Sequence, residues 1–89
     1  MIQNNNIKNN KVAVYVKSGS NQILSNKLLD NDIGIYFLDT ASDNQATRNS
    51  VRQSSVFAIY SKIEKGLGNV LGVNTLDRNR KDIEGREIN

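Results

Sequence analysis

The sequence predicts a small α/β domain in which three layers form around a mostly parallel sheet. Two apolar, β-branched runs at 11–17 and 33–38 have the composition of buried strands, and a third run follows at 70–76. Segments with the helical spacing of apolar residues separate these runs. Alternating strands and helices are typical of a parallel sheet with right-handed crossovers, so all three strand ends are expected at one edge.

The first half of the chain is expected to contain a lead-in, a strand and a helix. Residues 1–10 are rich in asparagine and lack apolar periodicity, which predicts a disordered lead-in and leaves 11–89 as the folded domain. The run at 11–17 has apolar residues on both faces, and the tyrosine within it is taken as a core residue. Turn and N-cap residues at 18–21 precede Ile23, Leu24 and Leu28, whose spacing predicts a helix up to Asp30.

The second half repeats this alternation. A strand is predicted at 33–38 and a loop at 39–47. A helical stripe is then expected to end at Gly66 or Gly68, before the strand at 70–76. The stripe consists of Val51, Val56, Ile59, Tyr60 and Ile63.

Composition excludes several kinds of chemistry. The chain has 89 residues, of which 37% are hydrophobic, enough for one small core. It has no histidine, which rules out a Ser-His-Asp relay and histidine-ligated zinc, and no cysteine, which rules out disulfides and thiolate metal sites. A formal charge of +3 is compatible with nucleic acid. No apolar run approaches the roughly 18 residues of a membrane span, and 1–10 lacks the apolar centre of a signal peptide, so a cytoplasmic protein is expected. The frequent asparagine is attributed to a biased genome.

Three short motifs follow the predicted strands. The first is Tyr15-Val16-Lys17-Ser18-Gly19-Ser20. The second comprises Phe37, Asp39, Ala41 and Ser42, followed by Arg48. The third is Leu76-Asp77-Arg78-Asn79-Arg80-Lys81. In this order, and over residues 11 to 84, they resemble the catalytic domain of serine recombinases, the resolvase/invertase family. The chain departs from the family pattern at Lys17, where the family has arginine. It departs again in the third motif, where the family's second arginine falls on Lys81 and Arg80 lies one place early.

The resemblance implies a DNA recombinase of the kind found in mobile elements, acting in resolution, inversion or integration. A serine, Ser18 or Ser20, would attack a DNA phosphodiester and form a phosphoseryl-DNA intermediate, with no metal or other cofactor. The remaining implied site residues are Arg48, Asp77, Arg78 and Lys81 in catalysis, with Lys17, Ser42 and Arg80 on the phosphate. The implied partners are DNA and either further copies of this chain in a homo-oligomer or a full-length recombinase, with no membrane and no metal. Family members continue with a long helix and a helix-turn-helix, so this chain is expected to be a truncated or decayed copy.

Two alternatives stay open at this point. One is a non-catalytic interaction module that binds DNA backbone or a full-length recombinase. The other is an unrelated nucleotide-binding α/β domain, which is disfavoured because a strand rather than a helix follows the glycines at 66–72. Each candidate also has a structural reading: Ser18 and Ser20 as turn residues, Asp77 and Arg78 as a surface ion pair, and Arg80 and Lys81 as part of a mixed-charge helix face.

Overall fold

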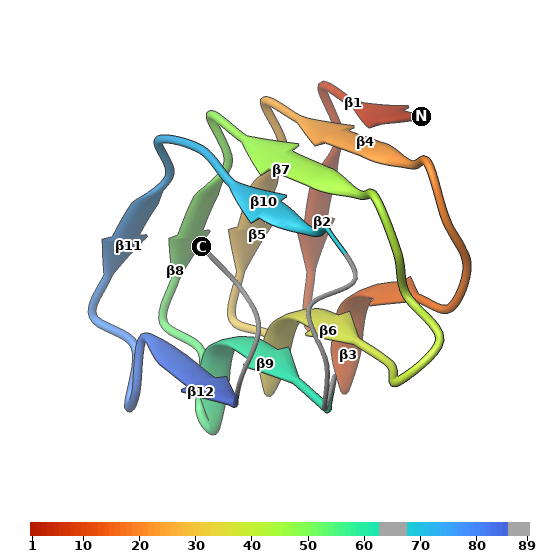
Figure 1. Ribbon diagram of the computed structural model, residues 1–89. Coiled ribbons are helices and arrows are strands. Elements are labelled where there is room, and N and C mark those ends of the chain that lie inside the picture. The colour runs from red at the N-terminus through yellow and green to blue at the C-terminus, as the bar shows by residue number, and fades with distance from the viewer. Residues whose placement is uncertain (63–67, 86–89) are drawn as a thin grey trace.

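The computed structural model, which describes residues 1–62 and 68–85, is a parallel β-helix: the chain coils around one core and adds a strand to each of three sheets in every coil (Figure 1). The first sheet contains β1 (Ile2–Gln3), β4 (Gln22–Leu24), β7 (Gln45–Thr47) and β10 (Val70–Leu71). The second sheet contains β2 (Asn6–Lys8), β5 (Lys27–Leu29), β8 (Ser50–Arg52) and β11 (Thr75–Asp77). The third sheet contains β3 (Val12–Val16), β6 (Ile33–Phe37), β9 (Phe57–Ser61) and β12 (Ile83–Gly85). All neighbouring strands pair in parallel.

The expected three-layer α/β domain is therefore wrong, because the residues that the structure describes contain no helix. The strands predicted at 11–17 and 33–38 are confirmed as β3 and β6, and their parallel pairing is confirmed as well. The helix predicted up to Asp30 is instead β4 and β5, and the stripe from Val51 forms β8 and β9, with Ile63 and Gly66 outside the described residues. The predicted strand at 70–76 divides into β10 and β11, the predicted loop contains β7, and β1 and β2 lie within 1–10. Among the described residues no helix has the length and apolarity needed to cross a membrane.

The chain turns at three corners in each coil, and left-handed backbone makes most of these turns. The first corner joins the first sheet to the second, the second corner joins the second sheet to the third, and the third corner leads back to the first sheet. Residues with positive φ are Asn4, Ser25 and Arg48 at the first corner, Asn9, Asp30, Gln53 and Arg78 at the second, and Ser20, Asp43 and Gly68 at the third. A single left-handed residue bends a strand sharply with little added length, although it strains most side chains.

The residue after each left-handed position is nearly always asparagine, and these asparagines form ladders along the coil axis. The backbone N–H of Asn26 donates to Oδ1 of Asn49 (3.0 Å), and Nδ2 of Asn49 donates to the backbone oxygen of Ile23 (2.9 Å). The same pattern joins Asn44 to Asn69 at the third corner (3.1 Å). Inward-pointing amides thus satisfy the corner N–H and C=O groups that no strand partner reaches. The ladder residues are Asn5, Asn26, Asn49 and Asn74, then Asn10, Asn31, Ser54 and Asn79, then Asn21, Asn44 and Asn69.

The inside of the coil is filled by apolar side chains that stack on one another from coil to coil. In register, Ile2, Ile23, Ala46 and Leu71 form one inward row, and Ile7, Leu28, Val51 and Leu76 form another. Where the second sheet meets the third, the core is narrow: a Cβ on Gly34 would lie 2.5 Å from the Ala58 oxygen and from Cγ1 of Val51. The inside of the coil therefore leaves no room for a ligand.

Successive coils lengthen while the strands keep their register. Ladder neighbours at the first corner are 21, then 23, then 25 residues apart along the chain. Most of the added residues lie at the third corner, which spans residues 17–21 in the first coil and residues 38–44 in the second. The strands of the three sheets thus keep their register while one corner varies in length.

Candidate functional site

The serines suggested as nucleophiles lie together at the third corner. Gly19, between Ser18 and Ser20, bridges to Ser42 in the next coil, and the Ser20 N–H donates to the Ser42 backbone oxygen (3.0 Å). The Ser18 backbone oxygen accepts from Nδ2 of Asn44 (2.9 Å). Lys17 lies beside them, with its ammonium 5.8 Å from the centre of the Tyr15 ring. The hydrogen bonds of these serines are those of a corner turn.

The cations and the carboxylate that were expected to join these serines lie elsewhere. Arg48 is at the first corner and Arg78 at the second, each as an exposed left-handed residue. Asp77 pairs with Arg52 at 3.0 Å, and Lys81 pairs with Glu84 at 2.6 Å. Arg80 lies exposed at the second corner, where its N–H donates to the Ser54 oxygen (3.0 Å). The fold places the expected site residues at three separate corners, which Figure 1 shows at different edges of the coil.

The outer face of the second sheet gathers polar and basic side chains from every coil. One outward row runs Asn6, Lys27, Ser50 and Thr75, and the neighbouring row runs Lys8, Leu29, Arg52 and Asp77. These eight residues are called the basic face from here on. Each row exists because alternate residues of a strand point outward and because equivalent strands stack in register.

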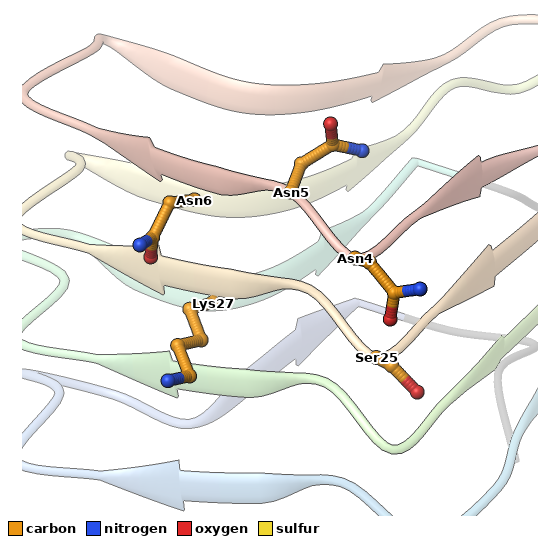
Figure 2. A pocket seen from close by; sticks show the side chains of 5 residues that line it. All are labelled: Asn4, Asn5, Asn6, Ser25 and Lys27. Atoms are coloured by element: carbon orange, nitrogen blue, oxygen red, sulfur yellow. The ribbon is translucent and has the colours of Figure 1, made fainter.

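Two adjoining hollows mark the basic face. The larger, of about 240 Å³, lies at the first corner and is lined by Asn4, Asn5, Asn6, Ser25 and Lys27 (Figure 2). The other, of about 190 Å³, is lined by Asn6, Lys27, Leu28, Leu29, Ser50 and Arg52. Asn6 and Lys27 line both, so the two hollows adjoin across β2, β5 and β8 and are together called the groove.

The groove offers hydrogen-bonding groups of both kinds. The amides of Asn4 and Asn6 each carry a donor and an acceptor, the Ser25 hydroxyl does the same, and the Lys27 ammonium donates only. Figure 2 shows Asn4 and Ser25 side by side at the corner, with Asn6 and Lys27 on the strands that follow. Such a set suits a ligand covered with hydroxyl or carboxylate groups.

The outer face of the third sheet is aromatic. The rings of Tyr15 and Tyr36 stack at 4.9 Å and 7°, Tyr36 and Tyr60 meet edge to face at 4.9 Å, and Phe57 stacks on Tyr60 at 5.0 Å. A hydrogen bond with Tyr36 is the main cause that raises the pKa of Lys62 above its ordinary value. The tyrosine at position 15 was expected in the core, but it is 51% exposed. Because the rings of Tyr15, Tyr36 and Tyr60 contact one another from strand to strand, we interpret this row as cross-strand stabilisation of the sheet.

The basic face escaped the sequence analysis because no local motif carries it. Its residues are single outward positions spaced a coil apart, and the coil length changes from 21 to 25 residues. The available signal was the recurring asparagine after a short apolar run, which marks the corners and hence the coil period.

A comparison with protein families matches residues 1–70 to the model described as "Periplasmic copper-binding protein (NosD)". No curated protein and no solved structure gave a match.

This match and the β-helix overturn several expectations. The chain is not a serine recombinase, and DNA recombination is wrong as its function. The family is described as periplasmic, which contradicts the expected cytoplasmic location. It is also described as copper-binding, which contradicts the expectation of DNA as the partner and of no metal.

The donors of this chain do not fit a copper site of the usual kinds. Copper is held in proteins mainly by imidazole, thiolate and thioether ligands. The sequence has no histidine and no cysteine, and its single methionine is Met1, which is 72% exposed. Within 1–62 and 68–85 no three acidic residues gather in a way that would hold a metal ion.

The family assignment rests on the extent of the match. Residues 1–70 contain the first three strands of every sheet and nine of the eleven ladder residues, from Asn5 to Asn69. The match thus covers most of the 89-residue sequence. On this basis the chain belongs to the NosD family.

Proposed function

We propose that this chain is a periplasmic, non-catalytic module that binds an extended polysaccharide along its basic face. The observation that carries the proposal is the pair of adjoining hollows, which share Asn6 and Lys27 in their linings. The periplasmic location comes from the family description.

The repeat of the groove supports a polymeric ligand. Equivalent side chains recur once per coil, at the spacing of neighbouring strands, about 4.8 Å. The row Asn6, Lys27, Ser50 and Thr75 therefore presents a polar group at each step over roughly 14 Å. A polysaccharide carries hydroxyl groups at regular steps of similar length, so several units can bind the same way at once.

The chemistry of the face favours sugar over protein as the ligand. Protein interfaces are enriched in aromatic residues and methionine. The large hydrophobic residues that are exposed in the described chain all lie off the basic face: Met1, Tyr15, Val70, Val73 and Ile83.

The proposal is of binding rather than cleavage, because glycoside hydrolysis generally needs two carboxyl groups across the bond. Asp77 is the single carboxylate of the basic face, and it is paired with Arg52.

The experiment is a titration of isotope-labelled protein with oligosaccharides, followed by amide shifts in NMR spectra. We expect shifts at Asn6, Lys27 and Ser50, and weaker binding in Asn6→Ala. The matched control is Gln45→Ala, which removes an outward amide from the first sheet and should leave affinity unchanged. Shifts confined to the third sheet, or no binding to any oligosaccharide at millimolar concentration, would reject the proposal.

Copper binding is a second candidate, favoured by the family match. Since imidazole and thiolate ligands are absent, we expect any copper on this chain to be held weakly by oxygen donors. Competition with a chromophoric chelator tests this. The double variant Gln22→His/Gln45→His, whose residues are neighbours in register, supplies a positive control. If the wild-type protein removes copper from the chelator as effectively as the double variant does, the chain has a copper site of another kind.

A further inference from the structure

We propose that the polysaccharide bound by the basic face is acidic, and that Lys27 holds a carboxylate of one sugar unit at the junction of the two hollows. This inference rests on the function proposed above and narrows it to uronate-containing chains. It draws on the charge of the face and the position of one ammonium group.

The basic face carries more positive than negative charge. Its cations are Lys8, Lys27 and Arg52, and its only carboxylate is Asp77. Arg52 and Asp77 form an ion pair at 3.0 Å, and in this pair the positive charge of Arg52 and the negative charge of Asp77 neutralise each other. Within the described residues, Lys8 and Lys27 have no ion-pair partner. Two cations are thus left for an anionic ligand.

Lys27 occupies the centre of the groove. In register it lies between Asn6 and Ser50, so an amide and a hydroxyl flank its position in the row. A carboxylate at that position would accept from the ammonium and from the neighbouring amide. Lys8 lies in the other row, one strand away, where Leu29 separates it from Arg52. Lys27 is therefore the cation that a ligand in the groove meets first.

Four other cations of the described residues, Lys17, Lys62, Arg80 and Lys81, are less suited to this role. The ammonium groups of Lys17 and Lys62 lie 5.8 and 6.0 Å from tyrosine ring centres on the third sheet. Lys81 is paired with Glu84. A third hollow, at the second corner, is lined by Arg80 beside this ion pair and by the apolar side chains of Val56 and Phe57, so it offers fewer hydrogen-bonding groups than the groove.

The test compares an acidic with a neutral oligosaccharide of equal length, hexagalacturonate and cellohexaose, by isothermal titration calorimetry. For wild-type protein we expect tighter binding of the acidic chain at low salt, with the preference shrinking as sodium chloride is added, since exposed charges are screened. Lys27→Gln should weaken hexagalacturonate about fivefold, as expected for one charge-assisted contact, and leave cellohexaose within twofold. Arg80→Gln is the matched control, because it removes one positive charge from a different surface. Circular dichroism verifies that both variants remain folded.

The outcomes separate the two proposals. If both oligosaccharides bind equally and Lys27→Gln changes neither, the acidic ligand is rejected while polysaccharide binding stands. Equal losses in Lys27→Gln and Arg80→Gln would assign the preference to net charge and reject the role of Lys27. If neither oligosaccharide binds, both proposals fail.

Discussion

Ser54 interrupts an asparagine ladder, and restoring the asparagine should stabilise the protein. Asn31 and Asn79 lie before and after it at the second corner, and all three corners otherwise use asparagine at this place. The Ser54 side chain is buried at 3% exposure, and its hydroxyl has no hydrogen-bond partner among the described residues. The Asn31 N–H likewise donates to no described residue, because the serine side chain is too short to reach it.

In Ser54→Asn, the new Oδ1 should accept from the Asn31 N–H. The new Nδ2 should donate to the Leu28 carbonyl, which stands in register between the Ile7 and Val51 carbonyls that Asn31 and Asn79 use. Two hydrogen bonds contribute about 2 kcal/mol, and ordering the longer side chain costs roughly half of that. A net gain of about 1 kcal/mol corresponds to a rise in Tm of roughly 4–8 °C for a domain of this size.

Thermal and urea denaturation followed by circular dichroism measure the gain, and hydrogen exchange should show slower loss of the Asn31 amide proton. Ser54→Ala is the control. Because the serine hydroxyl has no partner, this variant should lose little stability or none. A Tm for Ser54→Asn at or below that of the parent, with unchanged exchange at Asn31, would refute the ladder argument.

Three further perturbations test the same physical account. Asn49→Ala should lower the free energy of unfolding, measured by urea denaturation, by roughly 2–4 kcal/mol, because it leaves the Asn26 N–H and the Ile23 carbonyl buried without partners. Asn5→Ala, at the exposed first position of the same ladder, should lower it far less. Gly34→Ala should destabilise the protein by roughly 1–3 kcal/mol, since the new methyl group meets the Ala58 backbone; a Tm within a degree of the parent would contradict this. The pKa of Lys62 is raised by its hydrogen bond with Tyr36, so its stabilising contribution is complete below the unfolded value of 10.5 and is lost as pH rises through the higher folded value. The difference in Tm between the parent and Lys62→Gln should therefore be larger at pH 9 than at pH 12.

The sequence predicted individual strands better than the architecture that joins them. The five-residue strands β3 and β6 are continuous apolar runs, and both were recognised. The segment with Ile23, Leu24 and Leu28 was taken for a helix because Leu24 and Leu28 lie four positions apart, about one helical turn. In the structure Ile23 and Leu28 lie in different sheets, and the corner at Ser25 and Asn26 turns both inward. A spacing that crosses a corner imitates helical periodicity.

The asparagines held the missing information. Their abundance was attributed to genome composition. In the described residues, however, all seven buried polar side chains lie at or beside the corners, and five of them are ladder asparagines. The uneven coil length concealed the repeat, since no fixed period aligns Asn5, Asn26, Asn49 and Asn74. The basic face depends on that repeat, so its residues had no reason to be grouped before the register was known.

The uneven growth of the third corner has a consequence for how this protein accepts change. From 17–21 to 38–44 the corner lengthens without shifting the pairing of β6 with β3 or of β7 with β4. The ladders and the inward rows hold the register, so this corner can change in length without changing how the strands pair. Loops of foreign sequence grafted near Asp39 and Thr40 should extend from the coil while leaving both the core and the opposite groove intact.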